Sequence, residues 1–172
     1  MDTIQRLTAQ EASAVISQLV SLLQNAVDHG ASVGFIRPLT DEIAQKYWED
    51  VIAEIEYGSR ILLVTSRDGM IIGSVQLGLC TRQNGLHRAE VQKLFVHTSW
   101  RCRGIAKALM NAIEEEARIE GRSLLYLDTE PGKPAEVMYE RMGWTRVGEI
   151  PEYACNPDGD LHSTVIFFRK IT

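Results

Sequence analysis

The chain has 172 residues, of which 45% are hydrophobic and 24% charged, and its formal net charge is −5. This composition is typical of a folded globular protein and excludes a disordered, fibrous or repetitive one. The acidic balance argues against a nucleic-acid partner, because proteins that bind nucleic acids usually carry a basic surface. The length fits one domain of ordinary size, so we expect residues 1–172 to form a single domain.

The cysteines and the amino-terminal residues indicate in which cellular compartment the protein is expected. Cys80, Cys102 and Cys155 form no C-x-x-C pair, and the four histidines are scattered, so we expect no disulfide framework and no metal site. The first residues show no basic segment followed by an apolar one, and no apolar run approaches the ~20 residues of a membrane span. We therefore expect a cytoplasmic protein with free thiols and no membrane partner.

The first half of the chain changes from helical to strand periodicity. Residues 3–7 are predicted to form a short strand, and apolar residues then recur at helical spacing from Ala9 to Asp28. A second helix is expected from a cap at Thr40 or Asp41 to about Tyr57. Strands are then predicted at 60–65, 70–80 and 88–97, with turn signals at 67–69 and at Asn84-Gly85.

The second half alternates between helices and strands. An amphipathic helix is predicted over 104–120, a buried strand over 123–127, and a further helix from Pro134 to about Met142. The last strands are expected at 144–148 and 164–168. Hairpins make the early strands antiparallel, whereas the strands near 91–96 and 123–127 are joined through a helix and should be parallel. The sequence therefore predicts a mixed α/β sheet with helices on both faces.

The stretch between the predicted strand and the helix at 104–120 has the features of a phosphate-binding loop. The first N–H groups of a helix have no partner inside it and can hold an anion. Gly104 would let a phosphate approach the backbone, and Ala106 keeps the next position small. Positive charge is added by Arg101, Arg103 and Lys107. The alternative is an ordinary helix start with solvated basic residues.

Two motifs, one in this loop and one later in the chain, carry a resemblance to a known family. Arg101-x-x-Gly104-x-Ala106 matches the R/Q-x-x-G-x-G/A loop of the GNAT superfamily of N-acetyltransferases, and the segment from Tyr139 to Trp144 resembles its later Y-E-x-x-G-F motif. Within that family, most of the chain resembles an enzyme that acetylates a β-lactam amino-acid toxin. This closer resemblance rests on residues 30–35, 84–96, 127–130 and 145–168.

The resemblance implies a GNAT-type fold and acetyl-CoA as co-substrate. Its mixed sheet has antiparallel N-terminal strands and two central parallel strands that splay apart to admit the pantetheine arm. The residues that the resemblance assigns to the cofactor are Leu94, Phe95, Val96, Arg101, Cys102, Arg103, Gly104, Ile105, Ala106 and Lys107. Cys102 is expected to be a small filler and not a nucleophile. Gly132 stands where the family often has an asparagine that contacts the cofactor.

Transfer to an amine needs an acid and a base. An alkylammonium has a pKa near ~10, so a proton must be removed before the amine attacks. Tyr139 matches the family's tyrosine and is the candidate acid for the departing thiolate, although its helical face would also suit a core residue. Glu90 and Asp128 are the candidate bases, acting directly or through water.

Alternatives stay open for these carboxylates and for the activity. Glu90 could pair with Arg88 or Lys93, Asp128 could cap its loop, ordered water alone could be the base, and Glu130 could bind the substrate's ammonium. The leading hypothesis is an N-acetyltransferase that acts on a small-molecule amine, such as an amino-acid-like toxin, with the loops at 30–38 and 150–162 lining the amine site. The others are a peptide or protein N-acetyltransferase and a non-catalytic acetyl-CoA sensor. A monomer or a homodimer is expected.

Overall fold

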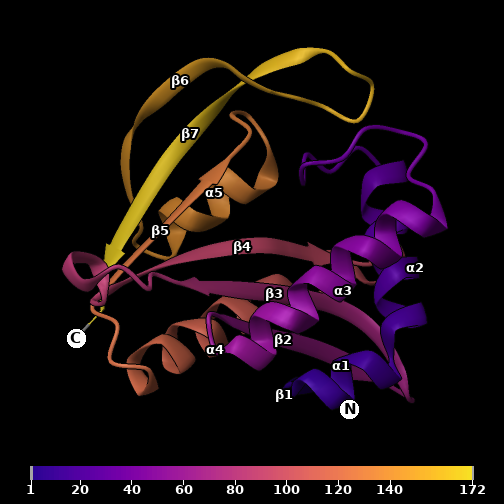
Figure 1. Cartoon of the computed structure of the whole chain (residues 1–172). Helices are drawn as coiled ribbons and strands as arrows, with labels where there is room; N and C mark the ends of the chain where they lie inside the picture. Colours follow the sequence, from indigo (N-terminus) through magenta and orange to yellow (C-terminus); the bar gives the residue numbers. More distant parts are fainter. Residues whose placement is uncertain (1, 172) are drawn as a thin grey trace.

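A computed structural model describes residues 2–171, in which seven strands form one sheet in the order β1-β2-β3-β4-β5-β7-β6 (Figure 1). The strands are β1 (Thr3–Arg6), β2 (Arg60–Arg67), β3 (Met70–Leu79), β4 (Arg88–Val96), β5 (Leu124–Thr129), β6 (Thr145–Cys155) and β7 (Leu161–Lys170). The helices are α1 (Ala9–Ala14), α2 (Ile16–Asp28), α3 (Asp41–Tyr57), α4 (Ile105–Ile119) and α5 (Pro134–Arg141). The expected mixed α/β sheet with helices on both faces is confirmed.

The two central strands are parallel and separate along their length. β4 and β5 pair only at their beginnings, where Arg88, Ala89 and Glu90 lie opposite Leu124, Leu125 and Tyr126. Beyond these residues β4 stays with β3, whereas β5 stays with β7 (Figure 1). The expected parallel pair that splays apart is therefore confirmed, with pairing limited to residues 88–90 of β4.

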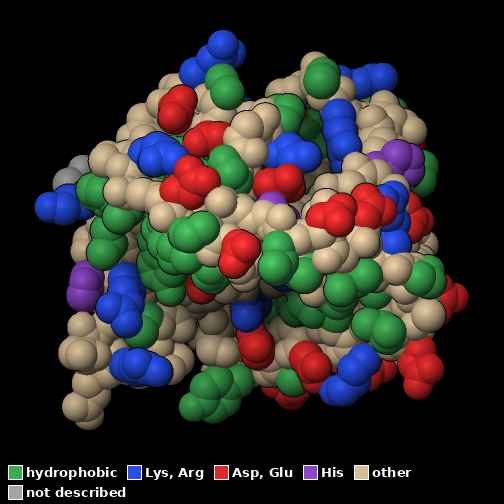
Figure 2. All heavy atoms as spheres, turned by 90° about the horizontal axis from the view of Figure 1, so that it is seen from above, with side chains coloured by type: hydrophobic (Ala, Val, Ile, Leu, Met, Phe, Trp, Pro, Cys, Tyr) green, Lys and Arg blue, Asp and Glu red, His purple; other side chains and the backbone are tan. Residues whose placement is uncertain are grey.

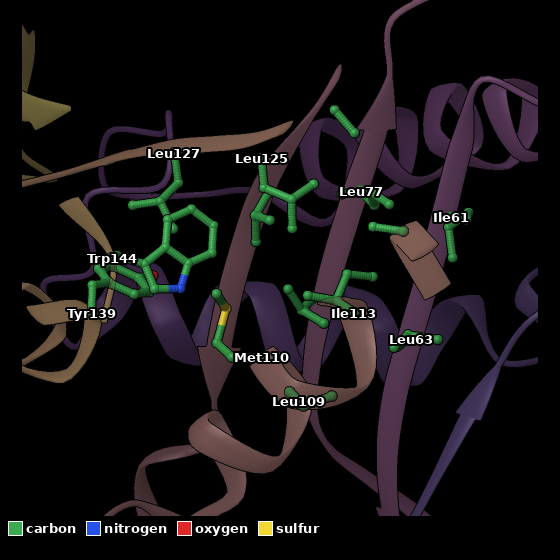
Figure 3. Packing of buried hydrophobic residues seen from close by; sticks show 14 of the residues in the cluster. Ile61, Leu63, Leu77, Leu109, Met110, Ile113, Leu125, Leu127, Tyr139 and Trp144 are labelled. Carbon is green, nitrogen blue, oxygen red and sulfur yellow. The ribbon is translucent and has the colours of Figure 1, made fainter. Parts of the chain in front are cut away.

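Two hydrophobic cores hold the helices on opposite faces of the sheet. On one face α4 buries Ile105, Leu109 and Ile113 against the sheet, as Figure 3 shows for part of this cluster. On the other face α1, α2 and α3 pack through a cluster that includes Trp48 and Leu19. The sheet is thus packed against helices on both faces, and these close-packed clusters hold the strands on either side of the gap between β4 and β5.

Two predicted elements were wrong in their extent. The single helix over 9–28 is broken at Val15, whose dihedral angles (φ −114°, ψ 15°) leave the helical range before the chain restarts at Ile16. The apolar spacing continues across this break, so periodicity gave no sign of it. The last two strands are longer than predicted, because β6 is an exposed edge strand whose side chains show no alternation of buried and exposed positions.

Glu114 is a buried charged residue of α4. It is 4% exposed, lies 3.2 Å from an Arg169 guanidinium nitrogen, and accepts a 3.2 Å hydrogen bond from Trp144 Nε1. Arg169 also donates to the carbonyl of Met142. This network joins α4 and β7 to the chain that follows α5, the helix that carries Tyr139.

Glu114→Ala should therefore lower the free energy of unfolding by about 2–4 kcal/mol, because it leaves a guanidinium and an indole N–H without their acceptor. Urea unfolding measures this loss. Glu115→Ala is the matched control, since Glu115 is 65% exposed and pairs with Arg118 on the surface. A surface pair contributes about 0–1 kcal/mol. Equal losses in the two variants would contradict the structural role of Glu114.

Candidate active site

β4 is irregular in the part that no longer pairs with β5. The register of β3 with β4 shifts between Ser74 and Gln76, and Lys93 has a positive φ of 53°. A bulge of this kind bends a strand and re-aims its side chains. Among the described residues, none of β4 after Glu90 pairs with β5, so the backbone of Phe95 and Val96 faces the gap on that side.

The loop between β4 and α4 presents free amides. Gly104 caps the helix with a left-handed φ of 81° and supplies no side-chain cap. The first N–H groups of α4, those of Ile105, Ala106 and Lys107, consequently lack a capping side chain. Cys102 also has a positive φ of 59° and is exposed, so it is not the packed filler that was expected. The loop is shaped as a cradle for an anion.

Basic side chains flank the cradle in different ways. Arg101 donates through Nε to the carbonyl of Val96 at 3.1 Å, which ties the loop to the end of β4. Arg103 and Arg67 both lie over the Trp100 ring, 4.7 and 4.5 Å from its centroid. Trp100 therefore holds two guanidinium groups beside the loop.

A groove of about 550 Å³ continues from the cradle toward α5. Lys107 from the first turn of α4 forms one wall, and α5 forms the opposite one. The lining residues are Lys107, Pro134, Val137, Met138, Arg141 and Met142. The groove therefore has two cationic side chains, Lys107 and Arg141, and lies beside the first turn of α4, which suits a ligand that carries several phosphates.

Tyr139 lies at the border of the core. It is 6% exposed, and its ring centroid lies 6.0 Å from those of Trp144 and Phe167. Figure 3 shows it beside Trp144. Within residues 2–171 its hydroxyl makes no hydrogen bond, yet it is not among the polar atoms sealed from solvent. Burial first, and then the charge of Asp128, raise the pKa of Tyr139, so this phenol keeps its proton well above neutral pH.

The candidate carboxylates lie on the two strands that bound the gap. Glu90 is partly buried and accepts a 3.4 Å hydrogen bond from the Tyr126 hydroxyl. Asp128 is exposed and accepts a 2.7 Å hydrogen bond from Thr164 Oγ1. Among the described residues neither carboxylate forms an ion pair, so pairing of Glu90 with Arg88 or Lys93 is not observed. Each carboxylate thus accepts one side-chain hydrogen bond and has further lone pairs that could bind a ligand.

Glu130 is placed differently from these two acids. Its carboxylate lies 3.3 Å from Lys133 Nζ. This ion pair lies within the turn that leads into α5. The structure therefore gives Glu130 a partner within the protein, and it leaves Glu90 and Asp128 as the unpaired acids of the gap.

The two loops expected to line an amine site meet each other. The backbone N–H of Arg37 donates to the carbonyl of Pro157 at 2.8 Å, and its guanidinium pairs with Asp158. Ser32 Oγ lies 2.8 Å from His162 Nε2. Figure 1 shows the α2–α3 loop beside the tip of the β6–β7 hairpin. These contacts could not be predicted from the sequence, because the two loops lie far apart in it. They bring the α2–α3 loop against the tip of the β6–β7 hairpin.

The surface and helices add further observations. Figure 2 looks down on these loops and shows acidic and basic side chains interspersed on that face. In the described part of the chain, no helix is long and apolar enough to cross a membrane. Residues 2–171 contain no cluster of three or more His, Cys, Asp or Glu side chains that could hold a metal ion.

Comparison with known proteins agrees with this geometry. The model of the Acetyltransferase (GNAT) family matches residues 34–144. The chain belongs to the GNAT family of acetyltransferases. It is 38% identical over 115 residues to an uncharacterized N-acetyltransferase of the hisH–hisA intergenic region of Azospirillum brasilense, covering 66% of this chain and 67% of that one. The chain spans less than half the length of two other curated relatives.

Solved structures share the fold at low identity. An N-acetyltransferase from Staphylococcus aureus Mu50 superposes with a TM-score of 0.82 at 14% identity, covering 100% of this chain and 99% of that one. The yncA protein of Salmonella typhimurium, solved with its cofactor acetyl-CoA, gives 0.77 at 18% identity over 99% and 94% of the two chains. These similarities establish the GNAT fold of this chain.

Proposed function

We propose that this acetyltransferase transfers an acetyl group from acetyl-CoA to the amine of a small molecule that resembles an amino acid. The observation that carries the proposal is the uncapped start of α4, where Gly104 turns the chain and leaves the first amides free. A tabtoxin-type β-lactam is a candidate acceptor, because the sequence resembles tabtoxin resistance protein over most of its length. This acceptor would give the protein a role in toxin resistance.

The residues present fit acetyl-CoA. The amides of residues 102–107, with Arg101, Arg103 and Lys107, would hold its pyrophosphate. The groove between Lys107 and Arg141 would take the phosphates and ribose beyond it. The backbone of Leu94, Phe95 and Val96 would face the pantetheine arm in the gap, where β4 has no β5 partner. When bound, acetyl-CoA supplies the activated acetyl thioester.

The side chains around the gap then have separate roles. Glu90 takes the proton from the acceptor's ammonium, directly or through water, since it lies where β4 and β5 cease to pair and forms no ion pair within residues 2–171. Asp128 holds the ammonium beside it. Tyr139 would donate its phenolic proton to the sulfur of the departing thiolate, because its raised pKa keeps it protonated and its hydroxyl makes no hydrogen bond within residues 2–171.

The assignment of the base predicts unequal effects of two isosteric changes. Glu90→Gln should lower kcat/KM by about 10²-fold, because an amide cannot accept the proton. Asp128→Asn should cost about tenfold through weaker binding of the ammonium. Steady-state kinetics with one acceptor measure both values. A larger loss in Asp128→Asn would exchange the two roles, and normal activity in both variants would leave water as the base.

The exposed thiol of Cys102 reports occupancy of the cradle. Saturating acetyl-CoA should slow alkylation of Cys102 by iodoacetamide about tenfold or more, because the ligand covers the loop. Mass spectrometry of the cysteine peptides measures the rates. Cys80 is the internal reference: a backbone hydrogen bond from Arg82 lowers the pKa of its thiol, and it lies at the end of β3. Equal rates at Cys102 with and without acetyl-CoA would argue against a ligand on this loop.

A thiol-release assay tests the proposed function itself. Acetyl-CoA is incubated with the protein and a panel of amino acids, amino-acid-like toxins, polyamines and peptides. Release of free CoA thiol with the amino-acid-like members is the expected result. Release with peptides alone would favour a peptide acetyltransferase, and binding of acetyl-CoA without any release would favour a sensor.

A further inference from the structure

The ammonium of Lys93 lies against the loop between α2 and α3. Lys93 lies at the bulge in the β3–β4 pairing, three residues after the last β4 residue that pairs with β5, and its ammonium donates to the carbonyl of Val33. The ammonium also lies 5.7 Å from the ring centroid of Phe35 and 5.8 Å from that of Tyr47. A Cβ placed on Gly34 would come within 3.1 Å of the Lys93 nitrogen, so the loop passes close to this cation.

The charge of Lys93 has no ion-pair partner in residues 2–171. One of its three N–H donors is used by Val33, and the two aromatic rings offer only weak attraction. Burial lowers the pKa of Lys93, while the charges of Asp128 and Glu90 act in the opposite direction and favour its charged form. A partly buried ammonium without a carboxylate is costly and is well placed to accept an anionic group.

The two unpaired carboxylates lie on the same side of the sheet as Lys93. Tyr126 and Glu90 are opposite each other in the β4–β5 register, and Asp128 follows Tyr126 by two residues on the same face. Both acids influence Lys93 through their charge. The neighbouring cation Arg60 is already paired with Glu54. Of the charged groups that act on Lys93, Glu90 and Asp128 therefore have no ion pair within residues 2–171.

We propose that the Lys93 ammonium binds the carboxylate of the acceptor while Glu90 and Asp128 face its amine, so that the enzyme selects zwitterions with an amine and a carboxylate. This proposal rests on the proposed function and adds the feature that defines the substrate class. An alternative role for Lys93 is purely structural, as a tether for the loop at Val33. The two roles differ in whether Lys93 distinguishes an acid from its uncharged analogue.

Matched pairs of acceptors measure that distinction. Each L-amino acid of the panel is compared with its carboxamide, and the ratio of kcat/KM values for the two is determined in the wild type and in Lys93→Met. We expect the wild type to prefer the acid. Lys93→Met should lower the ratio about 10–100-fold, the value of one charge-assisted hydrogen bond. Because the reactivity of each amine is the same with both proteins, the change in the ratio reports recognition of the carboxylate.

Two further variants separate recognition from folding. Lys93→Arg keeps the charge and should retain the preference for the acid. Lys46→Met removes a lysine that is 68% exposed on α3 and should leave the ratio unchanged. The melting temperature with saturating CoA gives a second readout, because amino acids should raise it in the wild type more than carboxamides do, and this difference should vanish in Lys93→Met.

The outcomes distinguish the two proposals. If the wild type uses carboxamides or polyamines as well as amino acids, the carboxylate site is wrong and the acetyltransferase function stands. If Lys93→Met lowers activity equally for acids and carboxamides, Lys93 is only a tether. If no acceptor releases thiol and acetyl-CoA does not bind, the proposed function itself fails. If acetyl-CoA binds without turnover, the test is whether amino acids raise the melting temperature more than carboxamides do. Equal melting temperatures with the two would overturn the carboxylate site.

Discussion

Tyr139→Phe should lower kcat by about 10²–10³-fold and leave the Kd for acetyl-CoA within a factor of two. The reason is that the variant removes only the proton donor for the departing thiolate. General acid catalysis by one group typically raises the rate about 10²–10⁴-fold. Because the hydroxyl makes no hydrogen bond within residues 2–171, its removal should change the free energy of unfolding by less than about 0.5 kcal/mol. Steady-state kinetics, calorimetry and thermal melting measure the three quantities.

The pH dependence of the wild type adds a second test of this residue. Since burial raises the pKa of Tyr139 above the ordinary value of 10.0, the phenol remains protonated from pH 7 to 9. Ionisation of Tyr139 should therefore cause no loss of kcat in that range. Tyr57→Phe is the matched control, because it removes a hydroxyl from a tyrosine that is 81% exposed at the end of α3. Normal turnover in Tyr139→Phe would assign the residue to the core alone.

Gly104→Ala should weaken binding of acetyl-CoA about 10–100-fold. A side chain at a positive φ costs about 1–2 kcal/mol, and the alternative backbone conformation would turn the first amides of α4 away from the pyrophosphate. A Cβ at this position meets no protein atom within 4 Å, so the expected loss comes from the ligand and the backbone and not from a clash.

Gly121→Ala provides the comparison at the other end of the same helix. Gly121 has a φ of 68° and equally open surroundings, so its substitution should cost similar stability. It lies away from the cradle and should leave the Kd for acetyl-CoA unchanged. Calorimetric titration of both variants separates the two effects. Equal affinity in Gly104→Ala and the wild type would show that the start of α4 does not hold the cofactor.

Motifs and periodicity predicted most of the elements, because these depend on neighbours in the sequence. Thr40 was expected to cap α3, and its hydroxyl accepts from the N–H of Ile43. The parallel strands followed from the helix between them. The burial of Glu114 is not predictable from local sequence, because its partner Arg169 lies 55 positions later in the chain. The break at Val15 leaves no trace in the apolar pattern on either side of it.

The candidate site was only partly accessible to the same reasoning. The cradle residues are contiguous, so a motif marks them. The proposed acceptor side combines Glu90, Lys93 and Asp128 with two loops that meet only in space. The sequence suggested Lys93 only as an alternative partner of Glu90, whereas its ammonium donates to the carbonyl of Val33. The positive φ of a non-glycine residue is the structural signal, and lysine at such a position is not predictable from local propensity.

A crystal structure of the protein with acetyl-CoA tests the central claim most directly. We expect the pyrophosphate on the amides of residues 102–107, the pantetheine arm between β4 and β5, and the thioester sulfur within hydrogen-bond reach of the Tyr139 hydroxyl. A structure with the diphosphate bound away from the start of α4, or with the gap between the strands closed in the presence of the cofactor, would contradict this account.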